Sequence, residues 1–316
     1  MTHRFTLELR RLERDSHDKC SICGRAFQKE DVAHSGYGAE GQPLYVGSCC
    51  EAKITETAAR YEWEPRAYEV PDESALLWRY MDFAKFVALL KESALYFSRA
   101  DLLGDRYEGA KGLLANKSKW DEYYLKFFRD ALQNPPPGAN FGLSTEELER
   151  RAQKFIVDLE ALGKDGLHTT FVSCWHESQV ESEALWRLYC PPSSAGVAIR
   201  TTYSALTLSL GDNPDIKIGR VRYIDFRKTF AGPNDAIFRK RQSLSHEREV
   251  RAVVHRFDAR DKVGIRIPIA LNQILETVVV SPFAPTWFEE VLKEIMQRFS
   301  VDVPIITSEL MLDPFF

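Results

Sequence analysis

Short apolar runs and amphipathic segments alternate along most of this chain, which predicts a mixture of strands and helices. Apolar runs predict strands at 75–80, 94–98 and 170–175, and a stripe of spaced apolar residues predicts a helix at 82–92. Further strands are predicted at 196–201, 217–224, 248–256, 263–268, 276–281 and 304–307, and further helices at 183–190 and 285–299. Strands with helices held to one side indicate the α+β class.

A helical insertion interrupts the predicted strands. Residues 117–132 predict one helix, and a second begins at a capping box made by Ser144 and Glu147 and ends at Gly163. We therefore expect a main domain at 75–316, with the helical insertion at 112–166. An N-terminal module at 1–62 and a linker at 63–74 precede this main domain.

Composition narrows the classes of function. The chain is 44% hydrophobic and 28% charged, which is typical of a globular protein. No window approaches the roughly 18 apolar residues of a membrane helix, and the charged N-terminus lacks an apolar signal core. We expect a cytoplasmic protein without membrane contact. The net charge of −4 argues against broad nucleic-acid binding, and the basic run 239–241 is either a local contact patch or a solvated face beside an acidic site.

Four of the six cysteines lie in the first fifty residues, at Cys20, Cys23, Cys49 and Cys50. The Cys-x-x-Cys-Gly spacing is typical of a zinc knuckle, and such clustering without a signal peptide favours metal over disulfides. A hairpin predicted at 35–47 and a helix at 51–60 complete the pattern of a treble-clef or zinc-ribbon finger. Tetrahedral zinc needs four ligands, and His34 or His17 is an alternative to one of the adjacent cysteines.

Glu247 and Glu249 introduce a predicted buried strand. Residues at alternate strand positions share a face, so the two carboxylates are expected to point together. Two like charges at such a short distance repel each other. The pKa of one carboxyl group therefore rises unless a cation or a ligand hydroxyl lies between them. The pair therefore predicts a site, although ion pairs with Arg248 and Arg251 on a solvated edge would explain it without any function.

Three short blocks give the pair a context: Trp78-Arg79-Tyr80, Phe171-Val172-Ser173 and Glu247-x-Glu249. Their order resembles the arginine, serine and glutamate pattern of ADP-ribosyltransferases. The predicted strand, helix and aromatic strand through Tyr96, Phe97 and Ser98 also resemble the elements that hold nicotinamide in that family. The resemblance implies an ADP-ribosyltransferase-like mixed β core and NAD as substrate.

The resemblance also implies a role for each residue. Arg79 would bind the pyrophosphate, and Tyr80, Tyr96 or Phe97 would stack on the nicotinamide ring. Glu249 would stabilise the oxocarbenium-like ribose, Glu247 would orient or deprotonate the acceptor, and Ser173 would brace the glutamate or the substrate. A nucleic acid or protein would be the acceptor.

The region from Ala75 to Val254 also resembles the bacterial domain-of-unknown-function-2971 family, through Val172-Ser173-Cys174-Trp175, Ala184-Leu185-Trp186-Arg187 and His246-Glu247-Arg248-Glu249. This resemblance implies a defence or toxin effector with an antitoxin or defence-system partner.

Two alternatives to a transferase remain. The first is a metal-dependent nuclease with magnesium held by Asp105, Glu108, Glu247 and Glu249. The second is a non-enzymatic zinc-finger adaptor or ligand sensor.

Overall fold

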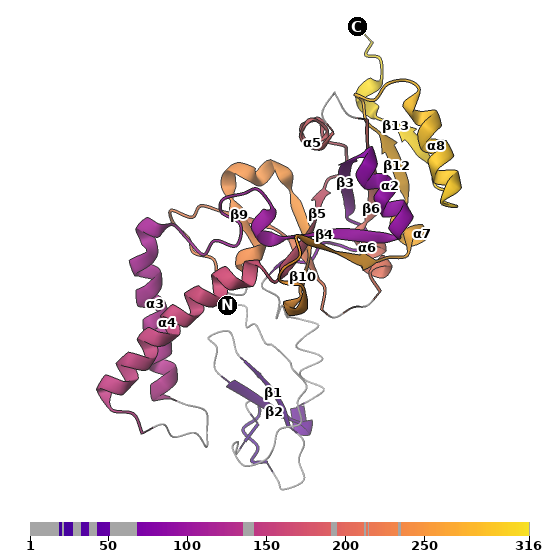
Figure 1. The fold of residues 1–316 in the computed structure, drawn as a ribbon. Coiled ribbons are helices and arrows are strands. Elements are labelled where there is room, and N and C mark those ends of the chain that lie inside the picture. Colours follow the sequence, from indigo (N-terminus) through magenta and orange to yellow (C-terminus); the bar gives the residue numbers. More distant parts are fainter. Residues whose placement is uncertain are drawn as a thin grey trace. The chain divides into compact units, whose positions relative to one another are not determined.

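The computed structural model describes residues 19–20, 22–27, 33–37, 43–50, 68–134, 142–190, 195–211, 213, 215–232 and 235–315 (Figure 1). The chain divides into two compact units, Met1–Ala67 with Ser118–Asp158, and Tyr68–Lys117 with Leu159–Phe316. The helix predicted at 51–60, the linker up to residue 67 and the alternative ligand His17 lie outside the described residues.

The first unit contains a small hairpin and most of a helical pair. The antiparallel strands β1 (Ala33–Tyr37) and β2 (Pro43–Gly47) confirm the hairpin prediction, and β2 runs directly into a short 3-10 turn at Ser48–Cys50. The helices are α3 (Lys117–Gln133) and α4 (Thr145–Leu167). Phe128 and Phe155 join them with ring centroids 5.2 Å apart.

The helix α4 does not end at Gly163 as the sequence predicted. Lys111 donates from Nζ to the Leu159 carbonyl at 2.8 Å, and its side chain occupies the space where a Cβ of residue 163 would stand. Because Gly163 has no side chain, Lys111 can lie against the helix at this position. The helix continues to Leu167.

The second unit is built on a nine-stranded, mostly antiparallel sheet with helices on both faces. Its strands are β3 (Leu76–Asp82), β4 (Ala94–Arg99), β5 (Thr170–Glu177), β6 (Gly196–Thr202), β7 (Lys217–Arg220), β10 (Glu249–His255), β11 (Gly264–Pro268), β12 (Thr277–Val280) and β13 (Ile305–Thr307). The helices are α2 (Phe83–Glu92), α5 (Glu183–Tyr189), α6 (Tyr203–Ser209), α7 (Leu271–Ile274) and α8 (Phe288–Arg298). The α+β class predicted from the sequence is confirmed, but the expectation of helices on one side is wrong, because α2, α6 and α8 pack on one face of the sheet and α5 packs on the other.

One predicted strand is divided in two. Residues 217–224 form β7 and then β8 (Arg222–Ile224), which leaves the large sheet and pairs with β9 (Arg239–Arg241). The break falls at Val221, whose amide donates to the Glu249 carbonyl at 2.8 Å. This departure brings β9 close to the start of β10.

The sheet forks at β5. One edge of β5 pairs with β10 along its length, from Thr170 to His176. The other edge is shared, because β4 pairs at Phe171 and Val172 whereas β3 pairs only at His176 and Glu177. Residues 173–175 therefore have no strand partner on that edge, and the sheet opens between β3 and β4.

The core lies on both faces of the forked sheet. Alternate side chains of β3, β4, β5 and β10 meet α2, α6 and α8 in one large apolar cluster that includes Leu77, Phe86 and Phe97. The intervening residues Trp78 and Tyr80 pack against α5 through Trp186 on the opposite face. This two-sided burial explains why the strands carry nearly continuous apolar runs.

Among the residues that the structure describes, no helix combines the length and the apolar character needed to cross a membrane.

Candidate functional site

Arg79 bridges the fork in the sheet. Its side chain leaves β3 and donates one hydrogen bond to the Ser173 hydroxyl of β5 and another, at 3.0 Å, to the Tyr96 carbonyl of β4. The guanidinium carbon lies 5.5 Å from the centroid of the Trp175 ring. The two predicted residues Arg79 and Ser173 are thus brought together, and the arginine bonds a backbone carbonyl at the fork.

A cavity of about 740 Å³ opens at this fork. It is lined from both faces of the sheet, by Lys85 and Glu92 of α2 and by Tyr189 of α5. Its volume is in the range of small-molecule and cofactor sites. Because the strands have separated here, one cavity can reach both faces.

The aromatic residues of the predicted site occupy different surroundings. Tyr96 is 40% exposed and lines the cavity together with Ser98, whereas Phe97, between them on β4, is fully buried in the apolar core. Phe97 therefore does not line the cavity. Strand alternation accounts for this division.

Tyr80 lines the cavity but is held in the core. Its ring meets Trp186 edge to face at a centroid distance of 4.9 Å, and its hydroxyl accepts a hydrogen bond from the Ser182 amide at 2.8 Å. Burial raises the pKa of its phenol. Tyr96 is thus the more accessible aromatic surface for a flat ring.

The two glutamates meet at one cation, although not through strand alternation. Glu247 ends a 3-10 turn and Glu249 begins β10, while Arg248 between them adopts a left-handed conformation with φ of 41°. This turn corrects the prediction that both glutamates lie on one strand. The Lys240 ammonium group donates to both carboxylates, at 2.9 Å to Glu249 Oε2. Lys240 is the cation that the repulsion argument required.

Arg251 holds the Glu249 carboxylate in place. Its Nε donates to Glu249 Oε1 at 2.7 Å, its Nη2 donates to Oε2 at 3.2 Å, and both terminal nitrogens donate to the Glu108 carboxylate. Burial opposes the charge of Glu249, but Arg251 and Lys240 outweigh it and lower its pKa to about 2. Burial raises the pKa of Glu108, and Arg251 counteracts this only in part. Glu249 is therefore an ionised carboxylate in a buried network.

His176 joins the same wall of the cavity. It is 6% exposed, and its Nδ1 donates to the Glu247 carbonyl at 2.6 Å. Burial lowers its pKa, so the ring is neutral near pH 7. With Nδ1 protonated, Nε2 carries a lone pair.

The sequence did not assign Lys240, Arg251 and Glu108 to one buried network. Lys240 lies in the basic run of 239–241, which suggested a nucleic-acid contact or a solvated face, yet it is only 8% exposed. Glu108 and Arg251 are 143 positions apart. A signal was present in the alternation of acidic and basic residues after Glu247, which is unusual at the start of a buried strand.

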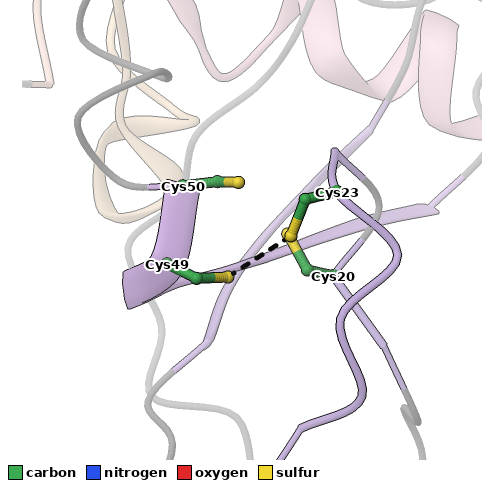
Figure 2. A group of neighbouring side chains, drawn as sticks. All are labelled: Cys20, Cys23, Cys49 and Cys50. Carbon is green, nitrogen blue, oxygen red and sulfur yellow. Dashed lines mark hydrogen bonds between the residues drawn. The ribbon is translucent and has the colours of Figure 1, made fainter.

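The four N-terminal cysteines converge on one point, as Figure 2 shows. All four sulfur atoms lie within 4.8 Å of one another, and the Cys23 and Cys49 sulfurs are 3.6 Å apart. A tetrahedron with metal–sulfur bonds of roughly 2.3 Å has edges of about 3.8 Å. The group is thus arranged to hold a metal ion. The side chain of His34 lies outside the described part of the structure.

The ionisation of the four cysteine thiols favours a cation bound between them. Burial opposes ionisation of Cys20, but backbone amides, led by that of Cys23, lower its pKa to about 6. Burial and the nearby sulfurs raise the pKa of Cys50 to about 12. The four thiols cannot all ionise without a positive ion to balance them.

Comparison with known proteins gives little sequence similarity. No protein-family model matches the chain, and no curated protein matches its sequence. A solved structure described as Thermus sp. 2.9 DarT in complex with ADP-ribosylated ssDNA is similar to the chain with a TM-score of 0.33 and 9% identity. The alignment covers 77% of this chain and 97% of that one.

Proposed function

We propose that this protein is an NAD-dependent ADP-ribosyltransferase that modifies a nucleic acid or protein acceptor. The observation that carries the proposal is the cavity at the sheet fork, which combines Arg79, the exposed Tyr96 ring and the Glu247–Glu249 pair. NAD needs a bidentate cation for its pyrophosphate, an aromatic face for its nicotinamide ring and a carboxylate for the ribose. The cavity contains a candidate for each of these three groups, and the candidates come from separate elements.

The reaction follows from these positions. The bond between the nicotinamide nitrogen and ribose C1′ breaks, and its electron pair leaves with neutral nicotinamide. The positive charge that develops at the ribose is stabilised by the nearby glutamates. A lone pair of the acceptor forms the new bond to C1′, and the acceptor proton passes to the Glu247 carboxylate.

The nuclease alternative has less support. Lys240 and Arg251 already neutralise Glu249, and Arg251 also occupies the Glu108 carboxylate. Within the described ranges, the cysteine group is the only set of side chains arranged to hold a metal ion. Magnesium would therefore have to displace two buried cations before it reached these oxygens.

Replacing Arg79 tests the proposed activity. Pure protein is incubated with NAD labelled on the adenylate, and single-stranded DNA, RNA and a cell lysate are offered as acceptors. We expect label on one acceptor class and an equal amount of free nicotinamide. In Arg79→Lys both should fall about 100-fold, because lysine keeps the charge but loses the bidentate donors.

The matched control is Glu276→Gln, an exposed glutamate that accepts hydrogen bonds from Thr202 at the end of β6 and does not line the cavity. It should retain wild-type nicotinamide release. The proposal would be rejected if wild-type protein neither bound NAD nor released nicotinamide with any acceptor.

We further propose that Cys20, Cys23, Cys49 and Cys50 bind one zinc ion and that this module helps to recruit the acceptor. Elemental analysis should find about one zinc per chain. A double Cys20→Ser and Cys23→Ser variant should lose it, while Cys190→Ser, which alters a buried thiol bonded to the Met81 carbonyl, should keep it. Full zinc content in the double variant would place the metal elsewhere.

A further inference from the structure

The two glutamates of the site differ in what they have left to offer a ligand. Glu249 is 5% exposed, and both of its oxygens accept hydrogen bonds from Arg251, with Lys240 adding another to Oε2. A carboxylate has about four acceptor positions, so those of Glu249 are nearly all occupied.

Glu247 is less engaged. Its Oε2 accepts from Lys240, and among the described residues its Oε1 has no partner. Its side chain is 16% exposed, against 5% for that of Glu249, and it lines the cavity. Glu247 thus has an open oxygen where a ligand would lie.

The backbone holds Glu247 in this position. Arg248 occupies the left-handed region, which is costly for a residue with a side chain, and so turns the chain between the two glutamates. His176 donates to the Glu247 carbonyl, and Lys240 ties its carboxylate to that of Glu249. Strain of this kind persists where the surroundings fix it.

We infer that Glu247, and not Glu249, is the carboxylate that accepts hydrogen bonds from the ligand's hydroxyl groups, and that Lys240 is the residue that positions it. This inference rests on the proposed function, in which those hydroxyls belong to the ribose of NAD. Glu249 then acts through Lys240, as the buried anion that fixes the ammonium group. The assignment gives Glu247 the ribose contact that the sequence resemblance implied for Glu249.

The test compares Glu247→Gln, Glu249→Gln, Lys240→Met and Lys240→Arg with the control Glu276→Gln. Melting temperature, NAD affinity by calorimetry and nicotinamide release are measured for each. In Glu247→Gln we expect release to fall about 100-fold with a melting temperature within about 1 °C of wild type. Glu249→Gln should lower the melting temperature by about 5 °C or more, because Arg251 and Lys240 lose a buried anion.

Variants of Lys240 distinguish a positioning role of this residue from a purely structural role. Lys240→Met should lower kcat with little change in KM, and Lys240→Arg should recover most of the lost rate because it restores a cation between the glutamates. Loss of kcat in both variants alike, or an unchanged rate in Lys240→Met, would refute the positioning assignment.

Two outcomes keep this inference distinct from the proposed function. Wild-type turnover that survives in Glu247→Gln, with loss of turnover in a Glu249→Gln variant of normal melting temperature, would overturn the inference and leave the transferase standing. If wild-type protein neither binds nor cleaves NAD, the proposed function fails. The melting temperatures of the variants then decide whether Glu249 is the structural carboxylate and Glu247 the one that the fold does not need. An unchanged value for Glu247→Gln beside a lowered one for Glu249→Gln supports the division, and the reverse refutes it.

Discussion

Replacing Arg251 with methionine should lower the free energy of unfolding by about 3–5 kcal/mol. Arg251 has no exposed surface, and its guanidinium is bonded to the carboxylates of Glu108 and Glu249 at once. Methionine fills much of the same volume but leaves the buried Glu108 carboxylate without its ion-pair partner and Glu249 with Lys240 alone. Urea denaturation at pH 7 measures the change.

The control for Arg251 is Arg256→Met. Arg256 makes a similar two-point contact with Asp258, but both side chains are at least half exposed, so the loss should stay within about 1 kcal/mol. A double variant of Arg251→Met with Glu108→Gln should recover part of the stability, because one of the stranded charges is gone. Equal losses for Arg251→Met and Arg256→Met would contradict a buried network.

Acid should destabilise the protein through Glu249 by about 3 kcal/mol between pH 5 and pH 2. The pKa of Glu249 is lowered in the folded state from its ordinary value of 4.5 to about 2, against the effect of burial, by Arg251 and Lys240. A lowered folded pKa gives stability that is complete above the unfolded value and is lost as pH falls towards the folded one.

This acid dependence is measured as a difference between wild type and Glu249→Gln. Exposed carboxylates with lowered pKa values, such as Asp258, are common to both proteins and cancel in the difference. Glu108 acts in the opposite sense, because its raised pKa means that its contribution declines as pH rises. A stability gap that stayed constant from pH 5 to pH 2 would exclude a depressed Glu249.

Local patterns were sufficient to predict much of the fold. The strand at Leu76–Asp82, the helix at Phe83–Glu92 and the strand at Ala94–Arg99 all follow their apolar spacing. The division of Tyr96 and Phe97 between cavity and core follows from the same alternation, because neighbouring strand residues face opposite sides.

The arrangement of the site depended on contacts that local patterns do not encode. Lys240 turns inward because β9 pairs with β8, a strand separated from β7 only by the break at Val221. The approach of Glu247 to Glu249 depends on the left-handed Arg248, which no sequence preference for arginine predicts. The fork exists because β3 and β4 pair with different ends of β5, and register of this kind is decided by the assembled sheet.

The bond from Arg79 to the Tyr96 carbonyl has a consequence for the evolution of such proteins. On the proposed function, a descendant that had abandoned catalysis would still need a donor for that carbonyl, so its fold alone would tend to preserve the arginine. Glu247, with its open oxygen, is under no comparable obligation to the fold. In a survey of related sequences, we expect the residue at position 247, rather than the one at 79, to separate working enzymes from inactive descendants.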